Sequence, residues 1–141
     1  MPDKVVLDTN VWISGILMGG LPGIVISTLE EKRASIYISP PMLEEIDRVL
    51  DHPRILNILK RSDVDKIEVL KRILSMSILV RPRVEIHVIM DDPQDNMFLE
   101  CAKEGNVHYV ITGDSHLKAL RMFEGIEIVS PREFLDKHQQ A

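Results

Sequence analysis

Short runs of branched apolar residues alternate along the chain with longer stretches whose apolar positions recur at helical spacing. The short runs predict strands, and the longer stretches predict helices that bury one face. The predicted strands cover residues 4–7, 35–39, 78–80, 84–89, 109–112 and 126–129. The predicted helices cover residues 11–18, 24–33, 40–50, 53–60, 64–75, 94–104, 115–122 and 131–138. Strands separated by helices predict an α/β fold, a three-layer α/β/α sandwich around a central parallel sheet.

Three local features set boundaries within this pattern. The glycine-rich sequence Gly19–Gly23 interrupts helical spacing, so the second helix is expected only from Ile24 onward. Ser62–Asp63 is the expected N-cap of the helix over 64–75. The buried face of that helix is expected to carry Val64, Ile67, Leu70 and Leu74. Gly105 is the expected left-handed cap that ends the helix over 94–104.

Length and composition agree with one globular domain over residues 1–141. The chain is 45% apolar and 28% charged, which is typical of a folded domain with a real core. No apolar run reaches the ~18 residues of a membrane span, and no signal-peptide pattern precedes the first strand. The single cysteine, Cys101, fits a reducing compartment. We therefore expect a cytoplasmic protein with no membrane partner.

The net charge of −5 does not by itself favour a nucleic-acid partner, since domains that bind nucleic acids usually carry a basic excess. Basic residues gather locally at Lys60–Arg61, Lys66, Lys71–Arg72 and Arg81–Arg83. A solvated helix face explains most of these positions, and clustered functional acids would account for part of the negative balance. The charge balance therefore leaves the class of partner open.

Two aspartates stand where a predicted strand gives way to a helix. Asp8 follows Val5–Leu7, and Asp114 follows the strand that ends near Thr112. Both positions suit a helix N-cap, and a capping role and a functional role have equal support from the sequence alone. In a parallel sheet, however, the carboxyl ends of the strands form the ligand crevice. We therefore expect both carboxylates at one edge of the sheet.

Further acids lie at the starts of predicted helices. Glu45 sits in the first turns of the helix over 40–50, where the helix dipole also favours a glutamate. Three more aspartates, Asp91, Asp92 and Asp95, lie close together around the start of the predicted helix over 94–104. A loop that only turns and caps a helix does not require three negative charges within five residues. This excess favours a ligand role for some of them, with Asp95 facing the site.

Carboxylates held together repel one another and need a cation or a shared proton. Oxygen ligands of this kind suit Mg²⁺, which combines a few carboxylates with waters and substrate phosphate. Thr9, Asn10 and Thr112 add polar groups beside Asp8 and Asp114. The histidines lack zinc-ligand spacing with Cys101, and His116 is interpreted as a surface histidine that could alternatively contact a phosphate.

Four segments of the chain resemble the motifs of the PIN domain family of metal-dependent nucleases. The segments are Val5–Val11, Ser39–Leu50, Asp92–Leu99 and Val110–Asp114, and they occur in the family's order along nearly the whole chain. The resemblance is to the small prokaryotic branch of toxin components, the VapC-like ribonucleases. Gln94 stands where another aspartate is frequent, and Asp91 is an additional acid.

The resemblance implies that Asp8, Glu45, Asp95 and Asp114 are catalytic and bind the metal, supported by Thr9, Asn10, Asp92 and Thr112. It implies a parallel sheet in an α/β/α sandwich, Mg²⁺ or Mn²⁺ as the cofactor, and hydrolysis of RNA phosphodiester bonds. It also implies a toxin of a toxin–antitoxin pair, with an antitoxin protein as partner and a homodimer or higher homo-oligomer as assembly. The helices between Pro53 and Ser75 are the expected interface, by analogy with other members.

Two other functions compete with RNA cleavage. A PIN-like domain can scaffold RNA or protein without cutting, although the acids of this chain are all present. A haloacid-dehalogenase-type phosphohydrolase also carries an aspartate after its first strand. Such an enzyme needs a second aspartate two residues later, and Asn10 occupies that place here.

Overall fold

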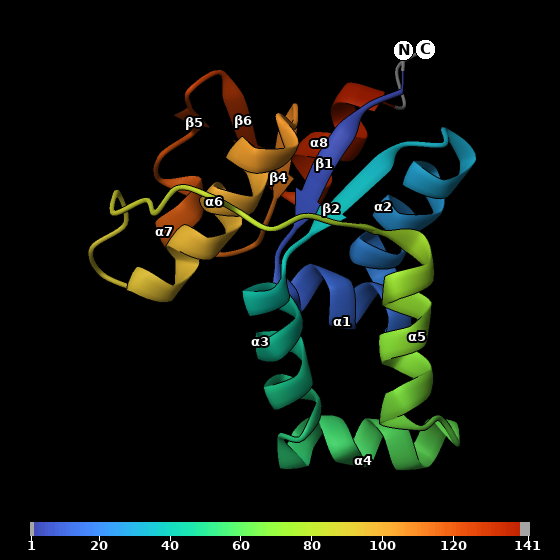
Figure 1. The fold of residues 1–141 in the computed structure, drawn as a ribbon. Helices are drawn as coiled ribbons and strands as arrows, with labels where there is room; N and C mark the ends of the chain where they lie inside the picture. The colour runs from blue at the N-terminus through green and yellow to red at the C-terminus, as the bar shows by residue number, and fades with distance from the viewer. Residues whose placement is uncertain (1, 139–141) are drawn as a thin grey trace.

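The computed structural model describes residues 2–138, so residue 1 and residues 139–141 of the predicted domain lie outside it. A six-stranded sheet with the order β3-β2-β1-β4-β6-β5 forms its centre (Figure 1). The strands are β1 Lys4–Leu7, β2 Ser35–Ile38, β3 Ile78–Leu79, β4 Tyr109–Ile111, β5 Met122–Phe123 and β6 Ile126–Val129. All neighbours pair in parallel except β5, which runs antiparallel to β6 at one edge. The predicted parallel sheet is therefore confirmed, with one antiparallel edge strand added.

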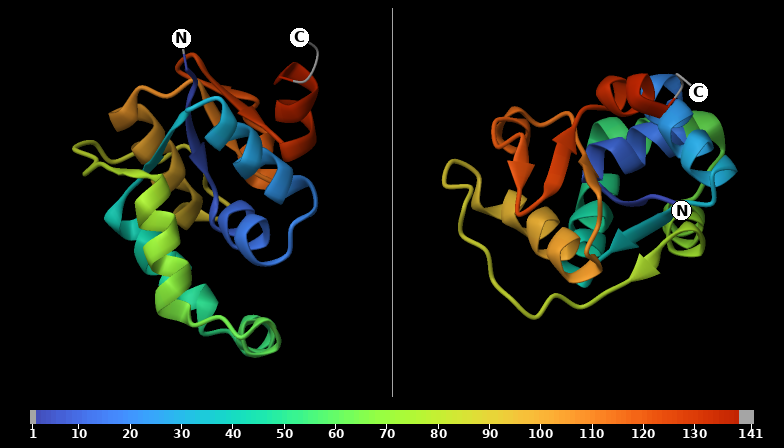
Figure 2. Two further views of the ribbon diagram at one scale, coloured as in Figure 1. Left: turned by 90° about the vertical axis from the view of Figure 1, so that its right-hand side faces the viewer. Right: turned by 90° about the horizontal axis from the view of Figure 1, so that it is seen from above.

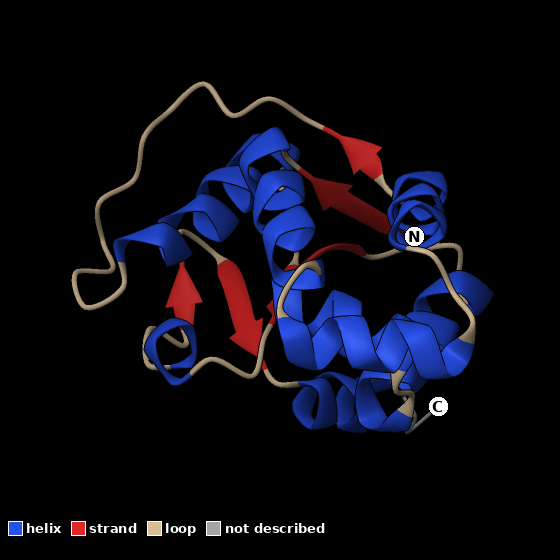
Figure 3. Cartoon of the chain, turned by 90° about the horizontal axis from the view of Figure 1, so that it is seen from below, coloured by secondary structure: helices blue, strands red, loops and turns tan. Residues whose placement is uncertain are grey.

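Helices cover both faces of the sheet. They are α1 Thr9–Leu17, α2 Gly20–Glu31, α3 Pro40–Leu50, α4 Pro53–Ser62, α5 Lys66–Met76, α6 Asn96–Gly105, α7 Ser115–Lys118 and α8 Pro131–His138, with the short 3₁₀ helix η1 at Pro93–Asp95. Helix α6 packs against β1, β2 and β4, whereas α1, α2 and α8 pack together on the opposite face. Figures 2 and 3 show these three layers in views along the sheet. The predicted α/β/α sandwich is confirmed.

Helices α3, α4 and α5 form an arm that leaves the end of β2 and returns to β3 (Figure 1). The predicted cap of α5 was wrong, because Asp63 adopts a left-handed conformation with φ 53° and ends α4 instead. Asp65 caps α5 in a reciprocal capping box with Glu68. The predicted buried face was half right, since Val64 and Leu70 are partly buried against the core. Ile67 and Leu74 are instead about half exposed, and Val69 and Ile73 are the buried residues of α5.

Other boundaries differ from the sequence prediction for identifiable reasons. Helix α2 begins at Gly20 rather than Ile24, because Pro22 is tolerated in a first turn, where its missing amide costs no hydrogen bond. Residues 84–89 form a loop, not a strand. The predicted helix over 115–122 ends at Lys118, and Met122–Phe123 forms strand β5 instead.

Gly105 ends α6 for a packing reason rather than as the left-handed cap that was predicted. Asn106 is the left-handed residue, with φ 51°. A Cβ atom at Gly105 would lie 2.9 Å from the Cγ atom of Tyr37 on β2. The glycine therefore allows the end of α6 to approach the sheet closely.

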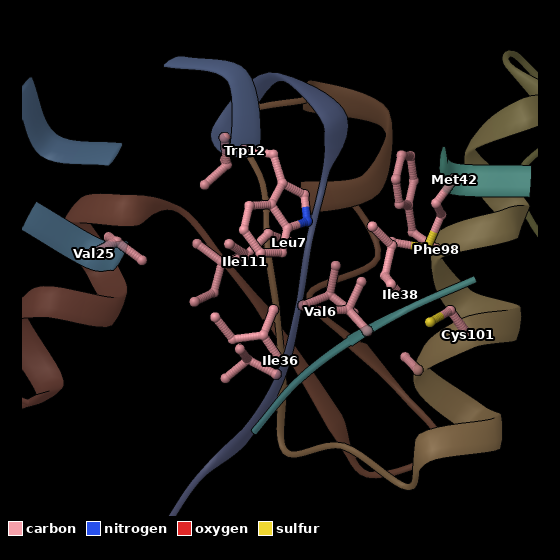
Figure 4. Close-up of a cluster of buried hydrophobic side chains, with 14 of the residues drawn as sticks. Val6, Leu7, Trp12, Val25, Ile36, Ile38, Met42, Phe98, Cys101 and Ile111 are labelled. Atoms are coloured by element: carbon pink, nitrogen blue, oxygen red, sulfur yellow. The ribbon is translucent and has the colours of Figure 1, made fainter. Parts of the chain in front are cut away.

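The core lies between the sheet and the two helical layers. Figure 4 shows Leu7, Trp12 and Ile111 on the side of β1 toward α1, and Phe98 and Cys101 on the side of α6. All five side chains are buried, and burial raises the pKa of the Cys101 thiol to about 12. Cys101 is thus a core residue with an unreactive thiol.

Among residues 2–138 no single helix is long and apolar enough to cross a membrane. Helices α1 and α2 reach that length and composition only when they are taken together, and a bend of 92° separates them.

Candidate metal centre

The candidate site forms where β1 and β4 end, at the middle of the sheet. Leu7 pairs with Ile111 in the parallel register, so Asp8 and Thr112 are the next residues on adjacent strands. The Asp8 amide extends the ladder by donating to the Ile111 carbonyl at 3.1 Å. Strand β1 has β2 on one side and β4 on the other, so the chain winds in opposite directions from this point of the sheet. Such a reversal opens a crevice at the carboxyl ends of the two central strands.

Asp8 both caps α1 and faces the crevice. Its Oδ1 atom accepts a hydrogen bond from the Val11 amide at 2.8 Å, and its Oδ2 atom accepts one from the Thr112 hydroxyl. The side chain is buried, with 4% exposure. Burial raises the pKa of Asp8, and the hydrogen bonds from Thr112, Val11 and Gly113 oppose that shift. Capping and site formation are therefore not alternatives at this position, since each oxygen has its own partner.

Thr112 connects the two strand-end aspartates. Its hydroxyl donates to Asp8 and accepts a hydrogen bond from the Asp114 amide at 2.9 Å. Asp114 in turn caps α7, because its Oδ1 atom accepts from the His116 amide at 2.7 Å. Thr112 is fully buried, so this relay is shielded from water. The supporting position predicted for Thr112 thus corresponds to a direct structural link between Asp8 and Asp114.

Asp95 ends η1 directly before α6, with Phe98, Leu99 and Ala102 buried behind it as expected. It is only 6% exposed, yet its Oδ2 atom has no hydrogen-bond partner among residues 2–138. Burial, a hydrogen bond shared with Asp114 and nearby negative charges raise the pKa of Asp95 to about 8. The same hydrogen bond lowers the pKa of Asp114. The two carboxylates therefore share one proton when no cation is present.

Asn96 anchors the loop that carries Asp92 and Asp95, a role that was not predicted from the sequence. Its Oδ1 atom accepts from the amides of Val88 and Ile89 at 3.1 and 2.9 Å. Its Nδ2 atom donates to the carbonyls of Ile89 and Pro93 at 2.9 and 3.0 Å. A buried asparagine that satisfies four loop groups fixes the acidic turn against α6. A polar residue directly after Asp95 at a helix start was the one available sequence indication.

Four side chains form a compact ligand set. Asp92, Asp95, Asp114 and His116 each offer one oxygen or nitrogen atom, and all four atoms lie within 4.8 Å of one another. The buried oxygen of Asp95 without a partner fits a cation here, since an ion would satisfy it and neutralise the neighbouring charges. Asp92 was predicted as an accessory acid. His116, interpreted from the sequence as a surface histidine, joins the set because α7 begins immediately at Asp114.

Glu45 approaches the same crevice from α3. Its Oε2 atom accepts a hydrogen bond from the Thr9 hydroxyl at 3.0 Å, which ties α3 to the start of α1. Burial raises the pKa of Glu45, the Thr9 hydrogen bond and Arg48 oppose the rise, and the charges of Asp8 and Asp92 add to it. Glu45 is half-buried, whereas the neighbouring Glu44 is exposed.

Two other polar residues named from the sequence are exposed to solvent. Asn10 is exposed on the first turn of α1, and across residues 2–138 no hydrogen bond joins its side chain to the cluster. Asp91 is exposed in the loop before η1. The structure thus gathers Asp8, Glu45, Asp92, Asp95 and Asp114 around one crevice, together with Thr9, Thr112 and His116.

The fold and the crevice define an α/β/α domain with a cluster of acids able to bind a cation at the carboxyl edge of its sheet. A family model described as the PIN domain matches residues 4–116, and the chain belongs to that family. The match includes every acid of the cluster and ends at His116.

Two comparisons give the breadth of the likeness. The chain is 29% identical over 146 residues to an uncharacterized protein of Methanocaldococcus jannaschii, covering 97% of this chain and 92% of that protein. A chain in the crystal structure of VapBC2 from Rickettsia felis, bound to a DNA fragment from their promoter, superposes with a TM-score of 0.61. That likeness covers 90% of this chain and 98% of the other at 13% identity, so it concerns the fold alone.

Proposed function

We propose that the protein is a divalent-metal-dependent ribonuclease that hydrolyses RNA phosphodiester bonds. The observation that carries the proposal is the ligand set around Asp95: this side chain has a buried oxygen without a partner, and it offers one of four ligand atoms that all lie within 4.8 Å of one another. An arrangement of this kind costs stability unless a cation satisfies it. Several classes of protein hold a metal centre of this kind, and membership of the PIN domain family supports a nuclease.

In this proposal Asp92, Asp95 and Asp114 hold Mg²⁺ or Mn²⁺ directly. Asp8, whose two oxygens accept hydrogen bonds from Val11 and Thr112, is a water-bridged ligand, and Glu45 completes the negative crevice. When bound, the ion would supply a water of lowered pKa and would stabilise negative charge on the phosphate oxygens. Thr112 fixes the orientation of Asp8 and the backbone of Asp114 through its two hydrogen bonds. These contacts hold the acids in place before substrate arrives, which is what a preorganised centre requires.

Glu45 is proposed to orient the attacking water and to take its proton. Thr9 holds one carboxylate oxygen of Glu45 at 3.0 Å and leaves the other oxygen for a water. The raised pKa of Glu45 makes it a better proton acceptor than an exposed glutamate. It lies on α3, a different element from those that carry the other acids.

Basic groups beside the crevice support a polyanionic substrate. A hollow of about 750 Å³ begins at Gly113 and Ser115, on either side of Asp114, and its lining includes Lys118 and Arg121. Lys118 also pairs with Glu133 at 3.3 Å, so Arg121 is the stronger candidate for a phosphate contact. The lining also contains Glu127 and Lys137, which pair with each other at 2.6 Å, so Arg121 supplies the net positive charge of this hollow.

The biological role that we propose is the toxin of a toxin–antitoxin pair, with an antitoxin protein as partner and a homo-oligomer as assembly. The motif resemblance and the fold likeness to a chain of the VapBC2 structure support this role. A cytoplasmic location follows from the same proposal.

The test is cleavage of a mixed RNA pool by the metal-free protein after addition of Mg²⁺ or Mn²⁺. We expect the wild-type protein to cut only with the ion, and Asp8→Asn to lose at least about a hundredfold of the rate, as for loss of one catalytic group. Asp91→Asn, which removes an exposed acid of the same loop region, is the matched control and should cut normally. Binding of RNA without metal-dependent cleavage would identify a scaffold instead.

A further inference from the structure

We propose that His116 is a nitrogen ligand of the bound cation and makes this centre select Mn²⁺ over Mg²⁺. The inference deepens the proposed metal centre, and it stands or falls on cation binding rather than on RNA cleavage. It concerns a residue outside the four acids that the motif resemblance implies.

The imidazole ring of His116 lies close to three carboxylates. One ring nitrogen of His116 lies within 4.8 Å of carboxylate oxygens of Asp92, Asp95 and Asp114. Ligand atoms that lie about 2.1–2.3 Å from a shared ion can be at most about 4.5 Å apart. Four atoms no more than 4.8 Å apart lie within about 3 Å of a common point, so each needs to move by less than about 1 Å to reach a coordination distance.

A separate observation shows that this is more than a solvated acidic surface. The Oδ2 atom of Asp95 is buried and without a hydrogen-bond partner in the part of the chain that the structure describes. The carboxylate of Asp95 faces Asp114 and Asp92, the same groups that surround His116. A cation at this point would satisfy the Asp95 oxygen and be in reach of the imidazole.

The contacts of His116 leave its ring available. The amide of His116 donates to Asp114, and the neighbouring Leu117 is fully buried, so the backbone of α7 is held against the core. The Nδ1 atom lies 3.7 Å from Asp114 Oδ1, beyond hydrogen-bond distance. Within residues 2–138 the ring makes no hydrogen bond, and the side chain is 46% exposed. A small rotation is therefore enough to bring the nitrogen to an ion.

The nature of the ligand decides the metal. Mg²⁺ takes oxygen ligands in near-ideal octahedral geometry and keeps several waters. Imidazole is a poor ligand for Mg²⁺ but an ordinary one for later divalent metals, whose affinities for nitrogen sites rise from Mn²⁺ onward. Three carboxylates retain affinity for both ions, so the imidazole adds affinity for Mn²⁺ alone.

The experiment is calorimetric titration of the metal-free protein with MnCl₂ and, separately, MgCl₂. We expect His116→Ala to weaken Mn²⁺ binding at least about tenfold, since even residues that only support a ligand change affinity by ~10–100-fold. Mg²⁺ affinity should change less than about twofold. His87→Ala, which removes an exposed histidine of the 84–92 loop, is the matched control and should change neither value.

Pulsed electron paramagnetic resonance of the Mn²⁺-loaded protein provides a direct second measurement. We expect nitrogen coupling to the ion in the wild-type protein and in His87→Ala, and its loss in His116→Ala. Unchanged coupling, or an equal loss of affinity for both ions, would overturn the assignment. An intact nitrogen ligand in a protein that cuts no RNA would instead refute the proposed function and leave this inference standing.

Discussion

Replacement of Asp95 by asparagine should stabilise the metal-free protein, and the effect should grow with pH. Asp95 is buried with one oxygen unpartnered, and its pKa is raised to about 8 from 3.8. A carboxyl group with a raised folded-state pKa contributes full stability below pH ~4, and this contribution is lost as the pH rises through about 8. An asparagine side chain carries no charge at any pH and can still donate to Asp114.

The size of the effect follows from the shift. At ~1.4 kcal/mol per unit of pKa, the raised pKa of Asp95 sets an upper bound of several kcal/mol on the cost of its charge at pH 8. The lowered pKa of Asp114 returns part of this cost, because the two groups share one proton. We therefore expect Asp95→Asn to gain about 2–3 kcal/mol at pH 8 and under ~1 kcal/mol at pH 5. For a chain of this length the gain at pH 8 corresponds to roughly 6–12 °C in Tm.

The assay is thermal unfolding in chelator at pH 5 and pH 8, repeated with Mn²⁺. A metal at a hundred times its Kd adds ~2.7 kcal/mol to the wild-type protein, and Asp95→Asn should lose most of that gain. Asp91→Asn, at an exposed acid four residues earlier, controls for a general change in charge and should stay within ~0.5 kcal/mol. A metal-free Asp95→Asn protein that melts below wild type at pH 8 would refute the reasoning.

Two further pairs of variants test the positioning of the site. Thr112→Val leaves the Oδ2 atom of Asp8 and the Asp114 amide without partners, so it should cost about 1–3 kcal/mol in unfolding free energy. Thr112→Ser keeps the hydroxyl and should cost far less, and equal costs would contradict the relay. Gly105→Ala should cost about 1–3 kcal/mol through the 2.9 Å approach to Tyr37. Gly113→Ala, with no atom within 4 Å and no left-handed backbone, should melt close to wild type, and a loss equal to that of Gly105→Ala would exclude the packing explanation.

The strand ends were predictable because sequence order and topology act together there. Asp8 and Asp114 each follow a short apolar run, and parallel pairing brings the ends of such runs to one edge. The position of Asp95 was predictable from the buried residues behind it. The inclusion of His116 was not, since it depends on α7 starting directly at its Asp114 cap and on where the 84–92 loop places Asp92.

The predicted strand over 84–89 shows why local pattern alone was insufficient. Its apolar residues suit a strand, but its amides bond to side chains of α6 instead of to a neighbouring strand. Glu100 accepts from the Ile86 amide at 2.9 Å, and Asn96 accepts from the amides of Val88 and Ile89. Because these acceptors lie several residues further along the chain, no window of local sequence distinguishes the loop from a strand.

Helix capping explains how the metal-free protein holds several acids together. Asp8 caps α1 with one oxygen and accepts a hydrogen bond from Thr112 with the other, and Asp114 caps α7 while it shares a proton with Asp95. The positive helix ends and the hydroxyl of Thr112 offset repulsion at these two positions. Asp95 has no side-chain cap bond and retains a buried oxygen without a partner. The electrostatic cost of the cluster is therefore concentrated at Asp95. A bound cation should stabilise the protein most at this residue, and removal of its charge should raise the stability of the metal-free protein while it weakens metal binding.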